Sequence, residues 1–267
     1  NSFNNHGVVG LINMPTARFY DESSYGITLY NGDPDQKISL TSFPFDWMEA
    51  SFFYMNIDDN QLCRSNLQNE IFCQGYKDKG FNFKVRVKEE GILPAIAIGI
   101  NDIAGTGYYS SEYVVGSYGI NNIDFHFGLS WGTLNGSRNS FKNPLGHITD
   151  DFYDRPENLE DEGGQFQPSR YFSGEKASPF FGFSYAPNEK FIVKFESDNT
   201  ITPGKVGYQQ SKSDYSFGVD FFINNNFTIG LANERDTYLS LKFVYKSNPK
   251  VSKPRYEYKK SDHNKND

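Results

Sequence analysis

The sequence has no long run of hydrophobic residues. Its longest apolar stretch, GILPAIAIGI at residues 91–100, is interrupted by Gly91, Pro94 and Gly99. A helix needs about 20 predominantly apolar residues to cross a bilayer, so we expect no membrane-spanning helix. A transmembrane β-barrel stays open, because its strands alternate between lipid-facing and lumen-facing residues and do not score as hydrophobic overall.

Excess positive charge is also absent. The chain has 26 Lys and Arg against 33 Asp and Glu, for a formal net charge of −7. Proteins that bind nucleic acid carry a cationic footprint, so we expect no nucleic-acid partner.

Motifs for catalysis or metal binding are scarce. The four histidines do not pair at metal-ligand spacing, and no G-x-S-x-G nucleophile elbow occurs. The acidic stretch at residues 149–163 includes Asp150 and Asp154, and such a run in one loop is typical of a solvated surface. We therefore expect no metal, no cofactor and no enzymatic activity.

The chain contains two cysteines, Cys63 and Cys73, which are close in the sequence. We predict that they form a disulfide closing a small loop, which implies an oxidising compartment. The alternative is two free thiols.

Aromatic residues, in contrast, are abundant: 17% of the chain, with 25 Phe and 18 Tyr. In FNFKVRVK, positions 81, 83, 85 and 87 are apolar and positions 82, 84, 86 and 88 are polar. NIDFHFGLSW, DYSFGVDFF and YLSLKFVYK repeat this alternation, which predicts β-strands. Strands are expected near residues 24–31, 36–43, 46–55, 80–88, 94–101, 108–117, 122–131, 178–186, 190–198, 213–222, 226–234 and 236–246.

The connections between these strands alternate in length. Every long one, near residues 56–79, 102–107, 132–177 and 199–212, would lie at one end of an antiparallel array. Outer-membrane barrels have short periplasmic turns and longer outer loops. We therefore predict an all-β fold, an antiparallel transmembrane β-barrel of about 12 strands, with a soluble sandwich as the alternative.

A barrel also predicts where other residues lie. The expected organisation is an N-terminal periplasmic segment at 1–23, the barrel at 24–246 and a polar tail or linker at 247–267. Girdles of aromatic residues are expected at both membrane interfaces. Candidates are Tyr25, Phe45, Trp47, Tyr54, Tyr113, Trp131, Tyr185, Tyr215, Tyr238 and Tyr245.

Charged residues on the polar face would point into the lumen. The candidate ligand-binding residues are Lys84, Arg86, Lys88, Glu49, Lys194 and Glu196. They would form a polar conduit or binding surface, with a basic strip that could meet acidic sugars. The alternative is that they only pair with one another inside a closed barrel. On the conduit hypothesis, reversing the charge of Lys84 and Arg86 would alter polymer secretion without unfolding the barrel.

Three ordered blocks resemble the YjbH family. They are GLINMPTAR at residues 10–18, WMEASFFY at residues 47–54, and the stretch from YKDKGFNFKVRVKEEG to GTGYYSSEYVVGS at residues 76–117. The family-motif residues in the first block are Gly10, Leu11, Asn13, Pro15, Thr16 and Arg18. We expect this block to be extended at the periplasmic rim, at or in the mouth of the barrel, and Arg18 to have a role beyond packing.

The resemblance implies an outer-membrane β-barrel linked to exopolysaccharide or group 4 capsule production. Family members are longer, and the sequence resembles their first barrel region. The expected function is polysaccharide export or surface assembly, as a conduit or docking element without bond chemistry. Expected partners are outer-membrane lipids, polysaccharide and other polysaccharide-export proteins. Two alternatives are a soluble periplasmic β-sheet protein that binds or processes glycans, and a barrel that only scaffolds partners.

Overall fold

The computed structural model describes residues 1–33, 35–65, 71–136, 139–156, 166–201 and 211–251. In residues 58–65, 71–74 and 76 only the backbone is described. The strands are β1 (Tyr25–Asn31), β2 (Asp35–Phe45), β3 (Met48–Ser65), β4 (Ile71–Lys88), β5 (Ala95–Ile103), β6 (Ser111–Ile120), β7 (Ile123–Gly132), β8 (Phe141–Lys142), β9 (Lys176–Asn188), β10 (Phe191–Ser197), β11 (Tyr215–Phe222), β12 (Phe227–Glu234) and β13 (Tyr238–Ser247).

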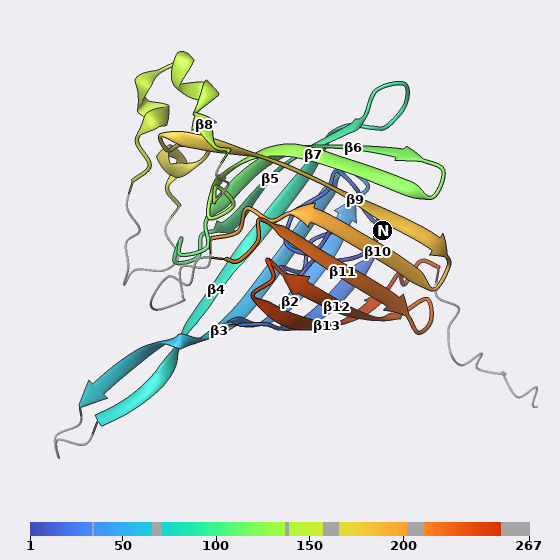
Figure 1. Ribbon diagram of the computed structural model, residues 1–267, viewed down its shortest axis with the longest axis horizontal. Coiled ribbons are helices and arrows are strands. Elements are labelled where there is room, and N and C mark those ends of the chain that lie inside the picture. Colours follow the sequence, from blue (N-terminus) through green and yellow to red (C-terminus); the bar gives the residue numbers. More distant parts are fainter. Residues whose placement is uncertain (34, 66–70, 137–138, 157–165, 202–210, 252–267) are drawn as a thin grey trace, which may run out of the picture.

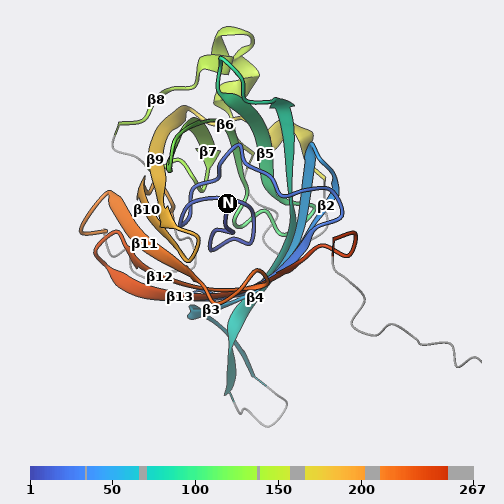
Figure 2. The same cartoon turned by 90° about the vertical axis from the view of Figure 1, so that its right-hand side faces the viewer.

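Twelve of these strands close into an antiparallel barrel, as the alternation predicted (Figures 1 and 2). Each pairs with its neighbours in chain order, except that β7 pairs directly with β9. The first and last strands pair along their length, from Tyr25 opposite Ser247 to Asn31 opposite Leu241. The two-residue β8 lies outside this ring and pairs only with the start of β9.

The two ends of the barrel differ as the sequence predicts. At one end the connections are residues 46–47, 89–94, 121–122, 189–190 and 223–226; we call this the short-turn end. The other, the long-loop end, carries residues 133–175 between β7 and β9 and residues 198–214 between β10 and β11. The first segment includes three short 3-10 helices, η1 (Pro144–His147), η2 (Asp150–Tyr153) and η3 (Pro168–Arg170). Among the residues that the structure describes, no helix has the length and hydropathy needed to cross a bilayer.

The hairpin of β3 and β4 is longer than predicted. Residues 56–79 were expected to form a loop, but pairing continues out to Ser65 opposite Ile71. Figure 1 shows this hairpin projecting far beyond the rim. The stretch was missed because backbone hydrogen bonds can continue a ladder without the apolar alternation by which the other strands were recognised.

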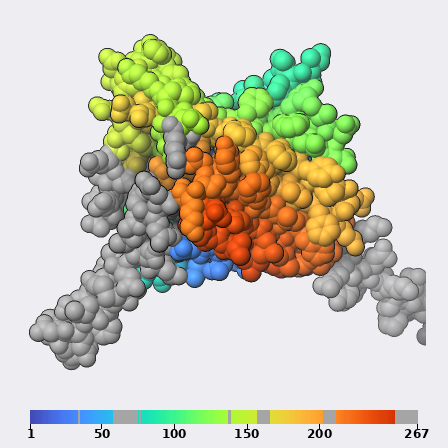
Figure 3. Space-filling model, viewed as in Figure 1, coloured from blue at the N-terminus to red at the C-terminus, as the bar shows by residue number. Residues whose placement is uncertain are grey.

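Side chains in the wall are apolar outside and polar inside. In β2, Lys37, Ser39 and Thr41 are buried, whereas Ile38 and Leu40 are 45% and 53% exposed. In a soluble sandwich the apolar face would be the buried one. An apolar outer face around a closed ring of strands is the arrangement of an outer-membrane-type barrel, so the sandwich alternative is wrong. Figure 3 shows this outer surface as continuous over β10 to β13.

Three of the predicted girdle aromatics are not exposed on the outer face. Tyr238 is in the inward phase of β13, and its hydroxyl donates to the buried Glu234 at 3.2 Å. Tyr113 is fully buried and packs in the main apolar cluster inside the barrel. Trp131 is 3% exposed and is covered by Phe172 from the long segment after β7, with ring centroids 5.2 Å apart. Alternation alone cannot predict the burial of Tyr113 and Trp131, because the residues that pack against them, such as Met14 and Phe172, are far away in the sequence.

Candidate functional site

The first 20 residues lie inside the barrel. Figure 2 shows the start of the chain near the middle of the ring of strands. Val8, Val9, Leu11, Ile12 and Met14 are each at most 2% exposed. We call residues 1–20 the plug. The sequence predicted an extended segment at the rim, at or in the mouth of the barrel. The segment lies deeper, because the barrel wall supplies partners for both its polar and its apolar groups.

The plug folds back on itself twice. Isolated bridges join Phe3 to Val9 and Gly10 to Pro15. The side-chain oxygen of Asn4 accepts hydrogen bonds from the backbone N–H of His6 and Val8, and its amide donates to the carbonyl of Asn13 at 3.1 Å. These bonds satisfy backbone groups that an extended segment would leave without partners in a filled lumen.

Glu196 on β10 holds the middle of the plug. Its carboxylate accepts hydrogen bonds from three successive backbone N–H groups, of Ile12 at 2.9 Å, Asn13 at 2.8 Å and Met14 at 3.1 Å. Glu196 is fully buried. A single carboxyl group thus satisfies three successive backbone N–H groups that would otherwise be buried without partners, so Glu196 is the main polar anchor of the plug.

Asn13 adds a second set of bonds at the same level. Its side-chain amide donates to Asp198 at 2.8 Å and to Glu234 at 2.7 Å. The amide of Asn5 donates to the other oxygen of Glu234, also at 2.8 Å. Three wall carboxylates thus converge on the plug from β10, β12 and the segment directly after β10.

Three wall lysines bind plug carbonyls. Lys84 on β4 donates to the carbonyls of Val9 at 3.0 Å and Arg18 at 2.9 Å, and pairs with Glu49 on β3 at 2.7 Å. The same Glu49 accepts from the N–H of Val9 at 2.8 Å. On the opposite wall, a second group repeats this arrangement. Lys194 donates to the carbonyl of Leu11 at 2.7 Å and pairs with Asp220 at 2.8 Å, while Lys242 donates to the carbonyl of Phe3.

Glycines in the wall make room for apolar plug residues. A Cβ on Gly182 would lie 2.4 Å from Leu11, and one on Gly26 would lie 2.5 Å from the ring of Phe3. Real Cβ atoms do not approach other heavy atoms this closely, so any side chain at either wall position would displace the plug or its ring.

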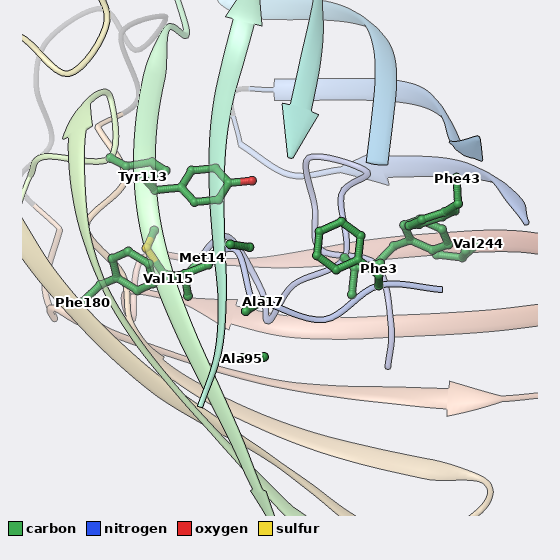
Figure 4. Packing of buried hydrophobic residues seen from close by; sticks show 13 residues of the cluster. Phe3, Met14, Ala17, Phe43, Ala95, Tyr113, Val115, Phe180 and Val244 are labelled. Atoms are coloured by element: carbon green, nitrogen blue, oxygen red, sulfur yellow. The ribbon is translucent and has the colours of Figure 1, made fainter. Parts of the chain in front are cut away.

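The apolar contacts of the plug run across the lumen. Figure 4 shows Met14 beside Phe180 and Val115, and Phe3 beside Phe43 and Val244. All six of these side chains are at most 3% exposed. The plug is therefore packed as tightly as a protein core.

Arg18 joins the end of the plug to the short-turn rim. Its guanidinium donates twice to Asp124 on β7, at 2.7 and 2.5 Å, and pairs with Glu90 at 2.5 Å. Its side chain is 20% exposed. This bidentate geometry suits arginine and not lysine, which gives the family-motif arginine a positioning role.

His6 closes the plug toward the long-loop end. Its Nδ1 lies 2.8 Å from the Nζ of Lys37. Burial, followed by the nearby charge of Lys37, holds the pKa of His6 well below 6.5, so the imidazole is neutral and accepts from the ammonium group. A cavity of about 20 Å³ lies between His6, Lys37 and Tyr109, enough for about one water.

The predicted lumen residues divide into two groups. Lys84, Glu49, Lys194 and Glu196 do line the lumen, but their charged atoms bind the plug. Arg86 and Lys88 lie half-buried toward the short-turn end, where Arg86 pairs with Glu89 at 3.2 Å and stacks over Phe19. A polymer-binding role for the six remains a prediction.

The expected effect of charge reversal at Lys84 does not fit these contacts. Lys84 is fully buried against Glu49. A glutamate in its place would bury two carboxylates side by side, which strongly disfavours the folded state.

The family-motif residues form the second half of the plug. A Cβ on Gly10 would lie 2.5 Å from the carbonyl oxygen of Met14, so Gly10 permits the close turn to Pro15. The hydroxyl of Thr16 donates to the carbonyl of Val9, and Leu11 and Asn13 make the wall contacts given above. The motif therefore encodes the shape of the plug.

Sequence reasoning missed the roles of Glu234, Asp198 and His6. Glu234 is in the inward phase of β12, two positions after Ala232, and Asp198 lies two positions after Glu196. Both are the last residues of the strands expected at 190–198 and 226–234, so following the inward phase to the end of each strand would have added both carboxylates. Nothing in the sequence indicates that His6 meets Lys37.

Cys63 and Cys73 lie in the part of the hairpin whose side chains are not described. Their backbone positions are directly opposite each other in the pairing of β3 with β4. The disulfide stays a prediction.

The acidic loop offers no enclosed carboxylate pair among its described residues. Asp150 and Asp154, the pair raised for glycan processing, are both exposed. Within the described parts of the chain, no group of three or more His, Cys, Asp or Glu residues could hold a metal ion.

Comparisons with known proteins agree with the sequence motifs. The family model YjbH, described as "Exopolysaccharide biosynthesis protein YbjH", matches residues 2–267. The "Uncharacterized lipoprotein YjbH" of Escherichia coli (strain K12) is 31% identical over 253 residues, which are 94% of this chain. The chain spans 36% of the length of that relative.

Among solved structures, the matches are distant. The KdgM porin aligns over 84% of this chain and 97% of its own with a TM-score of 0.44 and 6% identity, and the NanC porin over 84% and 98% with a TM-score of 0.39 and 10% identity. The family assignment therefore depends on the sequence matches alone. They cover nearly the whole chain, and the chain belongs to the YjbH family.

Proposed function

We propose that this chain is an outer-membrane barrel that serves exopolysaccharide export or surface assembly as a docking element, without bond chemistry. The observation that supports this best is the plug. Residues 1–20 of the same chain bind the buried wall residues Lys84, Lys194, Lys242, Glu49, Glu196 and Glu234. A lumen filled in this way offers no continuous path to a polymer, whereas the two ends of the barrel stay accessible.

The side chains of the barrel wall support the proposal that the barrel lies in the outer membrane. An apolar outer face and a polar, filled interior are the properties of a bacterial outer-membrane barrel. In that setting the short-turn end, and with it the start of β1 and the end of β13, would face the periplasm. The long-loop end with the β3–β4 hairpin would face outward.

The exopolysaccharide part is supported by the family to which the chain belongs. Because the chain spans only 36% of the Escherichia coli relative, the docking partner can be a further region of a longer protein, a separate export protein or the polysaccharide itself. Arg18, Glu90 and Asp124, which meet at the short-turn rim, are the surface nearest to a periplasmic partner.

A gated conduit is the second candidate. It is favoured by the chemistry of the plug contacts, many of which are hydrogen bonds and ion pairs to a polar wall. Water or a hydroxyl-rich polymer could replace such bonds, so a displaced plug would leave a hydrophilic channel.

A reversible lock on the plug separates the two candidates. A Cβ on Gly218 would lie 3.1 Å from Cγ1 of Ile12, so Ile12→Cys with Gly218→Cys places two sulfurs within disulfide reach. The double variant is expressed in cells that lack the native protein, and secreted exopolysaccharide is measured before and after reduction. Docking predicts the same secretion in both states. Secretion that stops when the plug is locked and resumes on reduction would contradict docking and support the conduit.

A further inference from the structure

A groove lies on the outer wall where β3 and β4 leave the barrel. It encloses about 730 Å³, and its lining includes Phe52, Tyr54, Lys77, Lys79 and Phe81. The turn at residues 104–106, between β5 and β6, forms part of its lining. Figure 1 shows the two strands continuing past the barrel from this position.

The groove spans the border between the apolar belt and the polar hairpin. The outward residues of β4 are apolar from Val87, at 60% exposure, through Val85 to Phe81, at 44%. The next outward residues in the same phase are Lys79 and Lys77, both exposed. The change from apolar to basic occurs within one step of the alternation.

The height of this border matches the edge of a membrane. Val87 and Lys79 are eight positions apart, about 27 Å along a strand at 3.4 Å per residue. A strand tilt of 35–45° reduces this to about 20 Å across the bilayer, close to the roughly 25 Å apolar band of an outer-membrane barrel. Lys79 and Lys77 therefore lie at the level of lipid headgroups.

The charges in the groove favour an anion. Lys77 and Lys79 lie on one face of β4, about 7 Å apart along the strand. The carboxylate of Asp78 points the other way: Asp78 is 1% exposed, and its Oδ1 accepts from the hydroxyl of Thr106 at 2.8 Å and the N–H of Lys79 at 2.7 Å. Next to the lysines, the rings of Phe52 and Phe81 are in contact, with centroids 5.4 Å apart and planes tilted by 55°, and form an apolar floor.

We propose that this groove binds one phosphate-bearing membrane lipid. Its phosphate lies between the ammonium groups of Lys77 and Lys79, beside the hydroxyl of Tyr54, and its acyl chains run over Phe52 and Phe81. The inference rests on the proposed placement of the barrel in a membrane, and adds a specific lipid site at its long-loop end.

Native mass spectrometry of the detergent-purified chain tests the site. Phosphatidylglycerol, phosphatidylcholine and inorganic phosphate are added separately to wild type, to Lys77→Gln/Lys79→Gln, and to the matched control Lys176→Gln/Lys190→Gln, whose lysines are also exposed. Wild type is expected to retain one phosphatidylglycerol, and the Lys77/Lys79 variant to retain it at least about tenfold less well, as for the loss of one charge-assisted hydrogen bond. The control is expected to match wild type, and phosphatidylcholine, whose phosphate is masked by its own cation, to bind more weakly.

Three results would overturn the lipid site. They are equal loss of phosphatidylglycerol in both variants, binding of inorganic phosphate to the same lysines without lipid, and displacement of the lipid by an acidic polysaccharide such as polygalacturonate. Heat-modified gel mobility shows whether each variant is folded. Membrane fractionation of wild-type cells tests the placement of the barrel separately, so the failure of the lipid site and of the proposed function can be distinguished.

Discussion

Glu196 and Asn13 are 183 positions apart in the chain, and the carboxylate of Glu196 accepts the backbone N–H of Asn13 at 2.8 Å. The bond joins the strand wall to a motif residue. With the neighbouring bonds from Ile12 and Met14, it fixes the plug at the middle of the lumen.

Glu196→Gln is expected to loosen the plug. An amide has one acceptor oxygen, so at least one of the three N–H groups loses its partner, at about 1–3 kcal/mol for each buried donor left unsatisfied. Hydrogen exchange of the amides of Ile12, Asn13 and Met14 should accelerate by at least about tenfold. Glu189→Gln, at an exposed turn position, is the control; unchanged exchange in Glu196→Gln would show that Glu196 is not the anchor.

Gly26→Ala is expected to displace Phe3. The added Cβ would lie 2.5 Å from the ring, which is held in place by Tyr20 and Phe43. Overpacking of this kind costs about 1–3 kcal/mol, measurable as a lower midpoint of thermal unfolding. Phe3→Leu should relieve the clash, so the double variant should be more stable than the sum of the single effects predicts. Simple additivity would mean that Phe3 does not pack on β1.

Lys84→Met is expected to destabilise the barrel itself. Glu49 would remain buried without its cationic partner, a change that typically costs about 3–5 kcal/mol. The midpoint of heat-modified gel mobility should fall, and Glu49→Leu in the same chain should restore most of it. If Lys84→Met alone leaves the midpoint unchanged, Glu49 and Lys84 are not a buried pair.

Plug docking is expected to weaken in acid through His6. The pKa of His6 is below 6.5 in the folded chain, because of burial and then Lys37. Between the folded pKa of His6 and its ordinary value of 6.5, a released plug therefore binds a proton that the docked plug does not. Docking should be at full strength above pH 6.5 and should weaken as the pH falls toward the folded pKa. Hydrogen exchange of residues 1–20 against pH measures this; His6→Gln should remove the dependence, whereas His147→Gln, at an exposed position, should retain it.

Cys63 and Cys73 are expected to be bonded, since their backbones face each other across β3 and β4. Intact mass without reductant should be two hydrogens lower than after reduction. Alkylation of both thiols in the unreduced, unfolded chain would exclude the bond.

Local sequence pattern predicts the barrel wall, because the alternation of apolar and polar residues within each strand shows which of its faces is outside and which is inside. Alternation at residues 81–88 depends only on which face is the apolar outer one, so it identifies β4 and the inward orientation of Lys84. Loop lengths likewise identify the two ends. The β3–β4 hairpin beyond residue 57 carries no such pattern, because both its faces lie outside the apolar belt.

Local pattern fails where distant segments meet. Tyr113 and Val115 face inward although the lumen was expected to be polar. They pack in one apolar cluster with the plug, which lies more than 90 positions earlier in the chain. The need for a glycine at position 26 is likewise not visible in the local sequence, because it arises from the ring of Phe3 packed against it. The motif could be found from the sequence, but its place inside the barrel depends on partners such as Glu196.

Cross-linking of the plug to the wall in cells tests the central claim that residues 1–20 fill the barrel. Ile12→Cys with Gly218→Cys is compared with Ile12→Cys with Val219→Cys, because Val219 is adjacent to Gly218 but is 40% exposed on the outer face. After mild oxidation, peptide mass spectrometry should find residue 12 joined to residue 218 and not to residue 219. A folded barrel with no link between residues 12 and 218, or with equal links to both wall positions, would contradict the plug.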